Sequence, residues 1–96
     1  MTATRIHLLF ERLRVEKRAA FIAYLTAGDP TPDATAGLVA ALQRGGADLI
    51  ELGVPFSDPV ADGVVNQEAA RRALASGTSL HKIIARVKTL RARTQV

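Results

Sequence analysis

Two short apolar runs, separated by one helical segment, constrain the fold of this chain more than any other feature. The first run, AAFIAYLTAGDP, is rich in aromatic and β-branched residues and predicts a buried strand at about residues 20–26. The second, ADLIELG, predicts another buried strand at residues 47–53. Strands that alternate with helices usually pair in parallel, so this order indicates an α/β fold.

Helical signals flank and separate these runs. Residues 5–17 place Ile6, Leu9, Phe10 and Leu13 at helical spacing. The sequence Thr31-Pro32-Asp33 is a helix-start signal with Thr31 as the expected N-cap, and this helix should run to about Arg44 and stop at two glycines. Residues 66–75 predict a third helix, and Ser79 is the expected cap of a fourth.

The predicted elements do not complete a sheet. A chain of 96 residues forms one domain at most, and two parallel strands are too few for a stable sheet because both edges stay open. A (β/α)8 barrel takes roughly 250 residues. We therefore expect residues 1–96 to be a single partial domain, comprising an N-terminal helix and the first two βα units of a TIM barrel.

Composition excludes several classes of protein. The chain has no cysteine, no apolar run long enough for a membrane span and no signal-peptide pattern at its start, so a cytoplasmic, non-membrane protein is expected. Seven of its thirteen Lys and Arg residues follow Glu68, with no acidic residue among them. No aromatic residue interleaves with these charges, so we expect no nucleic-acid binding but a solvated surface whose acidic neighbours lie on further chain.

The stretch ELGVPFSDPVADG, residues 51–63, holds three carboxylates at Glu51, Asp58 and Asp62. Strand alternation places Glu51 at the carboxyl end of the second strand, where the chemistry of α/β barrels collects. Burial there would raise the carboxyl pKa and suit a general acid or base near neutral pH. A second interpretation is a strand-end Glu that only accepts hydrogen bonds from loop amides.

The same stretch does not predict a metal site. Asp58 and Asp62 stand at the first and fifth positions of a calcium-loop spacing. The third and twelfth positions are Val60 and Ala69, which have no oxygen ligand in their side chains. The common nucleotide-binding glycine loops are also absent from the sequence.

Two segments, FIAYLTAGDPTPD and GGADLIELGVPFSDPVADGVVNQ, closely resemble the tryptophan synthase alpha chain family. The resemblance covers essentially this whole chain and about the N-terminal third of a family member. It implies a (β/α)8 barrel that cleaves indole-3-glycerol phosphate to indole and glyceraldehyde 3-phosphate. It also implies that Glu51 and Asp62 match the two catalytic carboxylates, and that Tyr24 matches an aromatic position of the indole pocket.

The resemblance extends to partners. Pro55 and Asp58 match positions that contact the beta chain, which carries pyridoxal phosphate and receives the indole, while the alpha chain needs no cofactor. Two departures are Val64, where the family usually has Pro, and Asn66, where an apolar residue is common. The family's phosphate site lies on later barrel loops, so we expect the isolated chain to be inactive. The alternative is a non-catalytic partial barrel that self-associates or binds a partner chain.

Overall fold

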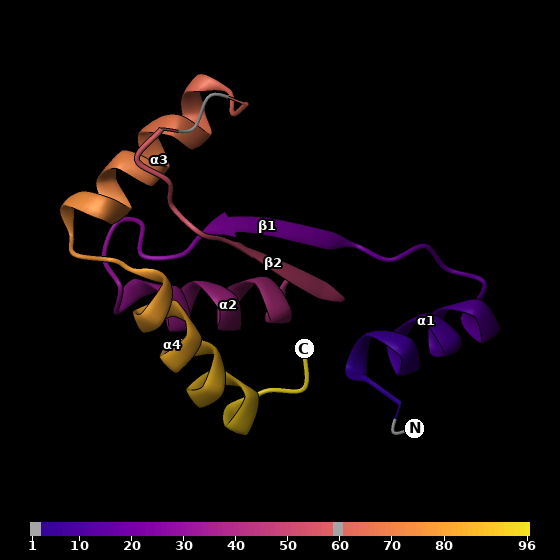
Figure 1. The fold of residues 1–96 in the computed structure, drawn as a ribbon. Coiled ribbons are helices and arrows are strands. Elements are labelled where there is room, and N and C mark those ends of the chain that lie inside the picture. The colour runs from indigo at the N-terminus through magenta and orange to yellow at the C-terminus, as the bar shows by residue number, and fades with distance from the viewer. Residues whose placement is uncertain (1–2, 59–60) are drawn as a thin grey trace.

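A computed structural model describes residues 3–58 and 61–96 and has the predicted order of elements (Figure 1). The elements are α1 (Arg5–Glu16), β1 (Ile22–Thr26), α2 (Ala34–Arg44), β2 (Leu49–Gly53), α3 (Val64–Ala75) and α4 (Leu80–Arg93). The α/β prediction is confirmed, and the chain has the arrangement of two consecutive βα units with a helix ahead of them.

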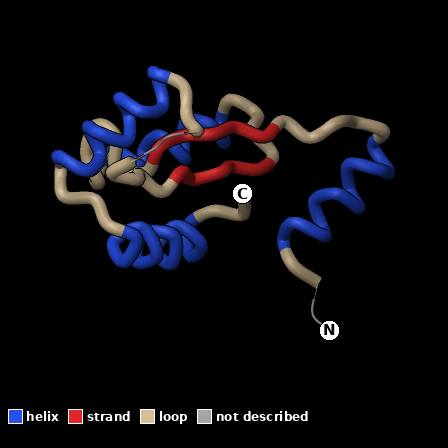
Figure 2. Tube along the Cα trace, turned by 45° about the horizontal axis from the view of Figure 1, so that its top comes forward, coloured by secondary structure: helices blue, strands red, loops and turns tan. Residues whose placement is uncertain are grey.

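The two strands form a parallel pair, as the alternation of elements predicted (Figure 2). Ile22 lies opposite Leu49 and Tyr24 lies opposite Glu51, so both carboxyl ends meet at one edge of the sheet. The two faces of the sheet differ in exposure. Ala23, on one face, is buried, whereas Ile22 and Tyr24, on the other, remain 46% and 49% exposed. The face that carries Tyr24 is therefore open.

The start of α2 differs from the prediction. The helix begins at Ala34 with Asp33 as its N-cap residue, so the predicted cap at Thr31 is wrong by two residues. The hydroxyl of Thr31 still accepts a hydrogen bond from the N–H of Ala34 at 3.3 Å. Thr31 therefore stabilises the turn that precedes the helix. The predicted stop is confirmed, since Gly45 is the C-cap.

The start of α4 was predicted correctly from the sequence, whereas the start of α3 was not. Ser79 is the N-cap of α4, as predicted, and its hydroxyl accepts from the N–H of Lys82 at 3.3 Å. Helix α3 begins at Val64, two residues earlier than predicted, because Gly63 takes the extended N-cap conformation directly before it.

The core is built largely from small side chains. Helix α3 buries Ala69, Ala70 and Ala73, and it contacts β1. Alanine lets a helix approach its neighbour closely, because no long side chain separates the backbones. The predicted stripe of α1 is only partly covered, since Leu13 is buried while Phe10 stays 42% exposed.

Helix α1 stands apart from the strands and is tied to the rest of the chain near both of its ends (Figure 1). The guanidinium of Arg5 donates to the carbonyls of Arg91 and Thr94, both at 2.9 Å. Just beyond the helix, Arg18 donates twice to the carboxylate of Asp48, at 2.9 and 3.0 Å. The pKa of Asp48 is lowered to about 2 by Arg18 and by the hydrogen bond from the backbone N–H of Phe21.

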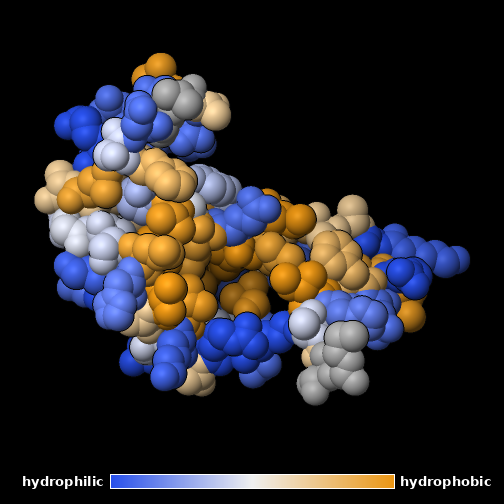
Figure 3. Space-filling model, viewed as in Figure 1, coloured by the Kyte–Doolittle hydropathy of each residue, from blue (hydrophilic) through white to orange (hydrophobic). Residues whose placement is uncertain are grey.

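A hollow of about 650 Å³ lies between α1, β2 and α4. Its walls are mainly apolar and include Leu8 and Leu9 of α1, Ile50 of β2 and Leu90 of α4 (Figure 3). In the part of the chain that the structure describes, no helix is long and apolar enough to cross a membrane.

Two of the basic residues that follow Glu68 pair with acidic residues of another segment of the chain. Arg72 pairs with Asp29, and Arg86 pairs with Asp33. The prediction that their acidic neighbours lie on further chain is therefore wrong for these two. The fold brings α3 and α4 beside the segment between β1 and α2, which carries both aspartates.

Candidate active site

Glu51 and Tyr24 lie side by side at the carboxyl ends of the strands. They are cross-strand partners in the parallel register, and neighbouring strands lie about 4.8 Å apart. Both side chains belong to the open face of the sheet, because residues opposite each other in register point to the same side. The structure thus brings together two of the residues singled out from the sequence.

The expected burial of Glu51 is wrong for this chain. Its side chain is exposed, although it stands within a strand. The described residues form only a two-stranded sheet, and the face that carries Glu51 has no covering layer. No hydrogen bond or ion pair to the carboxylate is found within residues 3–58 and 61–96, so the structure does not support the second interpretation, that Glu51 binds loop amides.

The phenol ring of Tyr24 lies over Gly53, the last residue of β2. A Cβ atom at position 53 would lie 1.9 Å from the hydroxyl oxygen of Tyr24 and 2.5 Å from the ring carbon that bears it. Glycine at this position therefore leaves the space that the tyrosine occupies. The contact of Gly53 with a residue of the other strand could be seen only in the fold.

The loop after β2 carries the remaining predicted residues. Pro55 is buried, whereas Asp58 and Asp62 are exposed. Val60, whose side chain argued against a calcium loop, lies outside the described residues. Among the described residues no cluster of three or more His, Asp or Glu side chains could hold a metal ion.

Asp62 is tied to the helix that follows it. The side-chain amide of Gln67 donates to the carbonyl oxygen of Asp62 at 2.8 Å, and Gly63 between them is the N-cap of α3. No hydrogen bond or ion pair joins Asp62 to Glu51 in the described part of the chain. The position of Asp62 is therefore coupled directly to α3.

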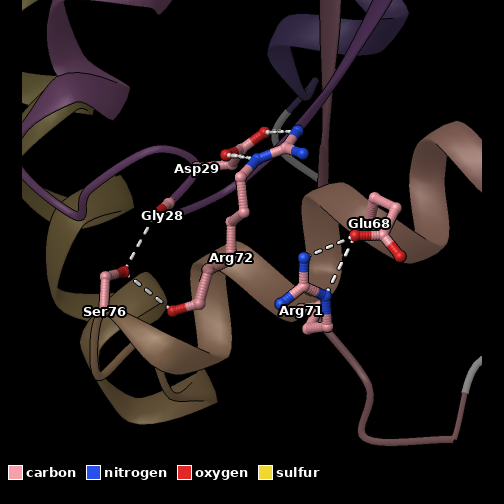
Figure 4. Close-up of polar contacts among 7 residues, drawn as sticks. Gly28, Asp29, Glu68, Arg71, Arg72 and Ser76 are labelled. Carbon is pink, nitrogen blue, oxygen red and sulfur yellow. Dashed lines mark hydrogen bonds and ion pairs between the residues drawn. The ribbon is translucent and has the colours of Figure 1, made fainter.

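A polar cluster that sequence analysis missed surrounds the turn after β1 (Figure 4). Arg72 of α3 donates twice to the carboxylate of Asp29, at 2.8 and 3.0 Å, and this lowers the pKa of Asp29. The hydroxyl of Ser76 donates to the carbonyl of Gly28 at 3.1 Å, and the hydroxyl of Thr35 accepts from the N–H of Gly28 at 3.0 Å. The sequence signals that could have indicated this cluster were an acidic residue three positions after the first strand and the excess of basic residues after Glu68.

The 650 Å³ hollow, and a smaller one lined by Gly28 and Thr35, do not coincide with this site. The 650 Å³ hollow lies beside β2 and α1, and Tyr24, Glu51 and Asp62 are not among its lining residues. The strand-end site is therefore an open surface in this chain, with its two carboxylates accessible to solvent.

Comparison with known proteins provides the family context. The family model described as tryptophan synthase alpha chain matches residues 10–96. The tryptophan synthase alpha chain of Solibacter usitatus is 60% identical over 93 residues, which cover 97% of this chain and 35% of the relative. That of Methylibium petroleiphilum is 53% identical over 88 residues, which cover 92% of this chain and 32% of the relative.

Solved structures agree with these relatives. A crystal structure of tryptophan synthase subunit alpha from Legionella pneumophila is similar with a TM-score of 0.94 and 39% identity, over 97% of this chain and 36% of that one. A structure of tryptophan synthase from M. tuberculosis is similar with a TM-score of 0.79 and 38% identity, over 86% of this chain and 33% of that one. This chain spans about a third of the length of the curated relatives it matches.

Proposed function

The chain belongs to the tryptophan synthase alpha chain family, and we propose on this premise that it forms the N-terminal third of an enzyme cleaving indole-3-glycerol phosphate. The products are indole and glyceraldehyde 3-phosphate, and the reaction belongs to tryptophan biosynthesis. We assign the enzyme to the carbon–carbon/carbon–oxygen lyases of the tryptophan synthase type and place it in the cytoplasm, as the family resemblance implies.

The observation that carries this proposal is the position of Glu51. It lies near the carboxyl end of β2, beside Tyr24 on β1, and ahead of a loop that brings a second carboxylate at Asp62. In (β/α)8 barrels the catalytic groups come from the carboxyl ends of several strands and the loops that follow them. Glu51 stands on a strand, which holds it more rigidly than a loop position would.

A carboxyl group at position 51 suits a retro-aldol cleavage. The bond between indole carbon 3 and the glycerol side chain breaks once that ring carbon is protonated. The adjacent hydroxyl loses its proton as the aldehyde carbonyl forms, so protons and electrons balance over the step. We propose that Glu51 donates the proton to carbon and accepts the one released by the hydroxyl.

Asp62 and Tyr24 have supporting roles in the proposal. The protonated indole carries positive charge that extends to its N–H group, and a carboxylate accepting a hydrogen bond from this N–H stabilises that charge. We assign this role to Asp62. Tyr24 supplies an aromatic surface against which the indole ring packs.

We further propose a beta chain as partner, in an assembly of two alpha and two beta chains, with pyridoxal phosphate bound by the beta chain and no cofactor bound by this one. Asp58 is exposed and available for direct contact with a partner. Pro55 is buried, so its contribution to the interface would come through the shape that it imposes on the loop.

The test uses a hybrid in which these 96 residues replace the matching part of the Solibacter usitatus relative. We expect the hybrid to release indole from indole-3-glycerol phosphate, and Glu51→Gln to lower kcat by about 10²- to 10⁴-fold because acid–base catalysis is lost. Glu68→Gln is the matched control, since Glu68 is an exposed acid that pairs with Arg71 on its own helix. Full activity of the Glu51→Gln hybrid would refute the assignment.

For the isolated chain we expect no measurable cleavage. The site is open to solvent on the Glu51 face, and about two thirds of the relatives' length is not matched by this chain. Indole release by the 96-residue chain that disappears in Glu51→Gln would contradict this expectation.

A non-catalytic role for the isolated chain is the second candidate, and exposed apolar side chains in and near the strands favour it. Large apolar side chains at Phe21, Ile22 and Phe56 are 51%, 46% and 68% exposed. Such surfaces promote association with another copy or with a partner chain. Sedimentation of the purified chain over a range of concentrations would detect a defined oligomer, and a stable monomer would exclude self-association.

A further inference from the structure

We propose that the Asp29–Arg72 ion pair is a positioning clamp that sets the direction of α3, and through it the place of Asp62 relative to Tyr24 and Glu51. The proposal rests on the proposed function for the role of Asp62. The geometry itself depends on no substrate, so it can be tested separately.

The clamp acts on a turn that is held from several sides. Arg72 donates two hydrogen bonds to the Asp29 carboxylate, and Ser76, at the end of the same helix, donates to the carbonyl of Gly28. On the opposite side, Thr35 of α2 accepts from the N–H of Gly28. Because a bidentate guanidinium–carboxylate pair fixes orientation as well as distance, it restrains the angle at which α3 leaves the turn.

Only the C-terminal half of α3 is packed. Its buried residues are Ala69, Ala70 and Ala73, whereas Val64 and Val65 at its start are 74% and 79% exposed. Figure 1 shows the start of α3 projecting away from the sheet. The contacts that orient the helix are therefore those near Arg72, and the exposed start moves with it.

The start of α3 carries Asp62. Gln67 holds the carbonyl of Asp62 against the helix at 2.8 Å. Val64 precedes Arg72 by eight residues, a distance of about 12 Å along the axis, so a tilt of about 10° would move this end by about 2 Å. Displacements of about 1 Å in a catalytic group are enough to cost roughly 10²-fold in rate.

The neighbouring Arg71 offers a matched control. It carries the same side chain one position earlier, but it pairs with Glu68 at 2.6 Å, three residues back on the same helix (Figure 4). Both residues of that pair belong to α3, so its loss should leave the direction of the helix unchanged. Of these two arginines, Arg72 is the one that links α3 to the turn that follows β1.

The experiment measures a distance between two spin labels in the 96-residue chain. The sequence has no cysteine, so Val65→Cys on α3 and Ala41→Cys on the exposed surface of α2 provide two unique attachment sites. Pulsed electron–electron double resonance then gives the distribution of distances between the two labels in the doubly labelled parent chain and in its Arg72→Gln and Arg71→Gln variants. We expect Arg72→Gln to broaden the distribution or shift its centre by about 2 Å, as the tilt implies, and Arg71→Gln to match the parent.

A variant with the two charges exchanged, Asp29→Arg together with Arg72→Asp, should restore the distance distribution of the parent. A loss of stability alone would not predict this recovery. Should circular dichroism show that Arg72→Gln has lost its helices, Arg72→Lys decides, because it keeps the charge but not the bidentate geometry. An Arg72→Lys or Arg72→Gln distribution with the same width and the same centre as that of the parent would overturn the proposal, as would an equal change caused by Arg71→Gln. A hybrid barrel that releases no indole would refute the proposed function and leave the distance result unaffected.

Discussion

Replacing Gly28 by alanine puts a methyl group where the fold has no room for it. The backbone at Gly28 has a φ of +90°, a conformation that residues with a Cβ rarely adopt. An ideal Cβ would lie 1.9 Å from the hydroxyl oxygen of Thr78 and 2.8 Å from its Cβ. Thr78 is only 6% exposed, so its side chain cannot turn out into solvent.

Two separate costs follow from this geometry. The positive φ costs about 1–2 kcal/mol for a residue with a side chain. Overpacking against a buried neighbour costs about 1–3 kcal/mol more. Gly28→Ala should therefore lower the free energy of unfolding by about 2–5 kcal/mol, which is a large part of the stability of a small domain.

Urea unfolding followed by far-ultraviolet circular dichroism measures this loss. Gly46→Ala is the matched control, because Gly46 has a φ of +104° with no atom within 4 Å of an added Cβ. The Gly46→Ala variant should lose only the free energy that the positive φ costs, about 1–2 kcal/mol. The difference between the two variants isolates the contact with Thr78.

A double-mutant cycle tests the contact directly. Thr78→Ala removes the hydroxyl, which is buried without a hydrogen-bond partner among the described residues. In that background Gly28→Ala should cost less, with a coupling of about 0.5–3 kcal/mol. The reasoning is refuted if Gly28→Ala costs no more than Gly46→Ala, or if its cost is unchanged by Thr78→Ala.

Two further predictions concern the ion pair at Asp48 and the contact of Tyr24. Because Arg18 and a backbone N–H lower the pKa of Asp48 from 3.8 to about 2, their stabilisation is complete above about pH 4 and is lost as the pH falls towards 2. Urea unfolding at a series of acidic pH values should therefore show a smaller acid-induced loss in Asp48→Asn, and identical pH profiles would contradict the pairing. Gly53→Ala should displace the half-exposed phenol of Tyr24 while changing the free energy of unfolding by no more than about 0.5 kcal/mol. Tyr24 is the only tyrosine and there is no tryptophan, so intrinsic fluorescence reports this residue alone, and unchanged emission would count against the contact.

Periodicity and cap residues were enough to predict the order of elements. Apolar spacing predicted α1, and the hydroxyl of Ser79 predicted where α4 begins, because both signals act within one or two helical turns. The N-cap of α2 was predicted at Thr31 and is Asp33, since a hydroxyl that accepts from a nearby N–H stabilises a turn as well as a helix end. Errors of this size are expected where several residues compete for the same backbone donor.

The candidate site could be predicted only in part. Glu51 and Tyr24 were singled out from the loop and strand patterns, and their adjacency follows from parallel pairing. The burial of Glu51 was predicted from its place in a strand and is wrong, because burial depends on whether another layer covers that face. Whether Glu51 and Asp62 act on a substrate stays a prediction, to be decided by the hybrid barrel.

The sequence by itself determined which segments become helices and strands and which family the chain resembles, because these features depend on neighbouring residues and on the order of a motif. Only the tertiary structure decided that Arg72 reaches Asp29, 43 residues earlier in the chain, while Arg71 pairs on its own helix. No local pattern distinguishes these adjacent arginines. Which arginine reaches Asp29 depends on which face of α3 lies against the turn after β1, and the two segments meet only when the chain is folded.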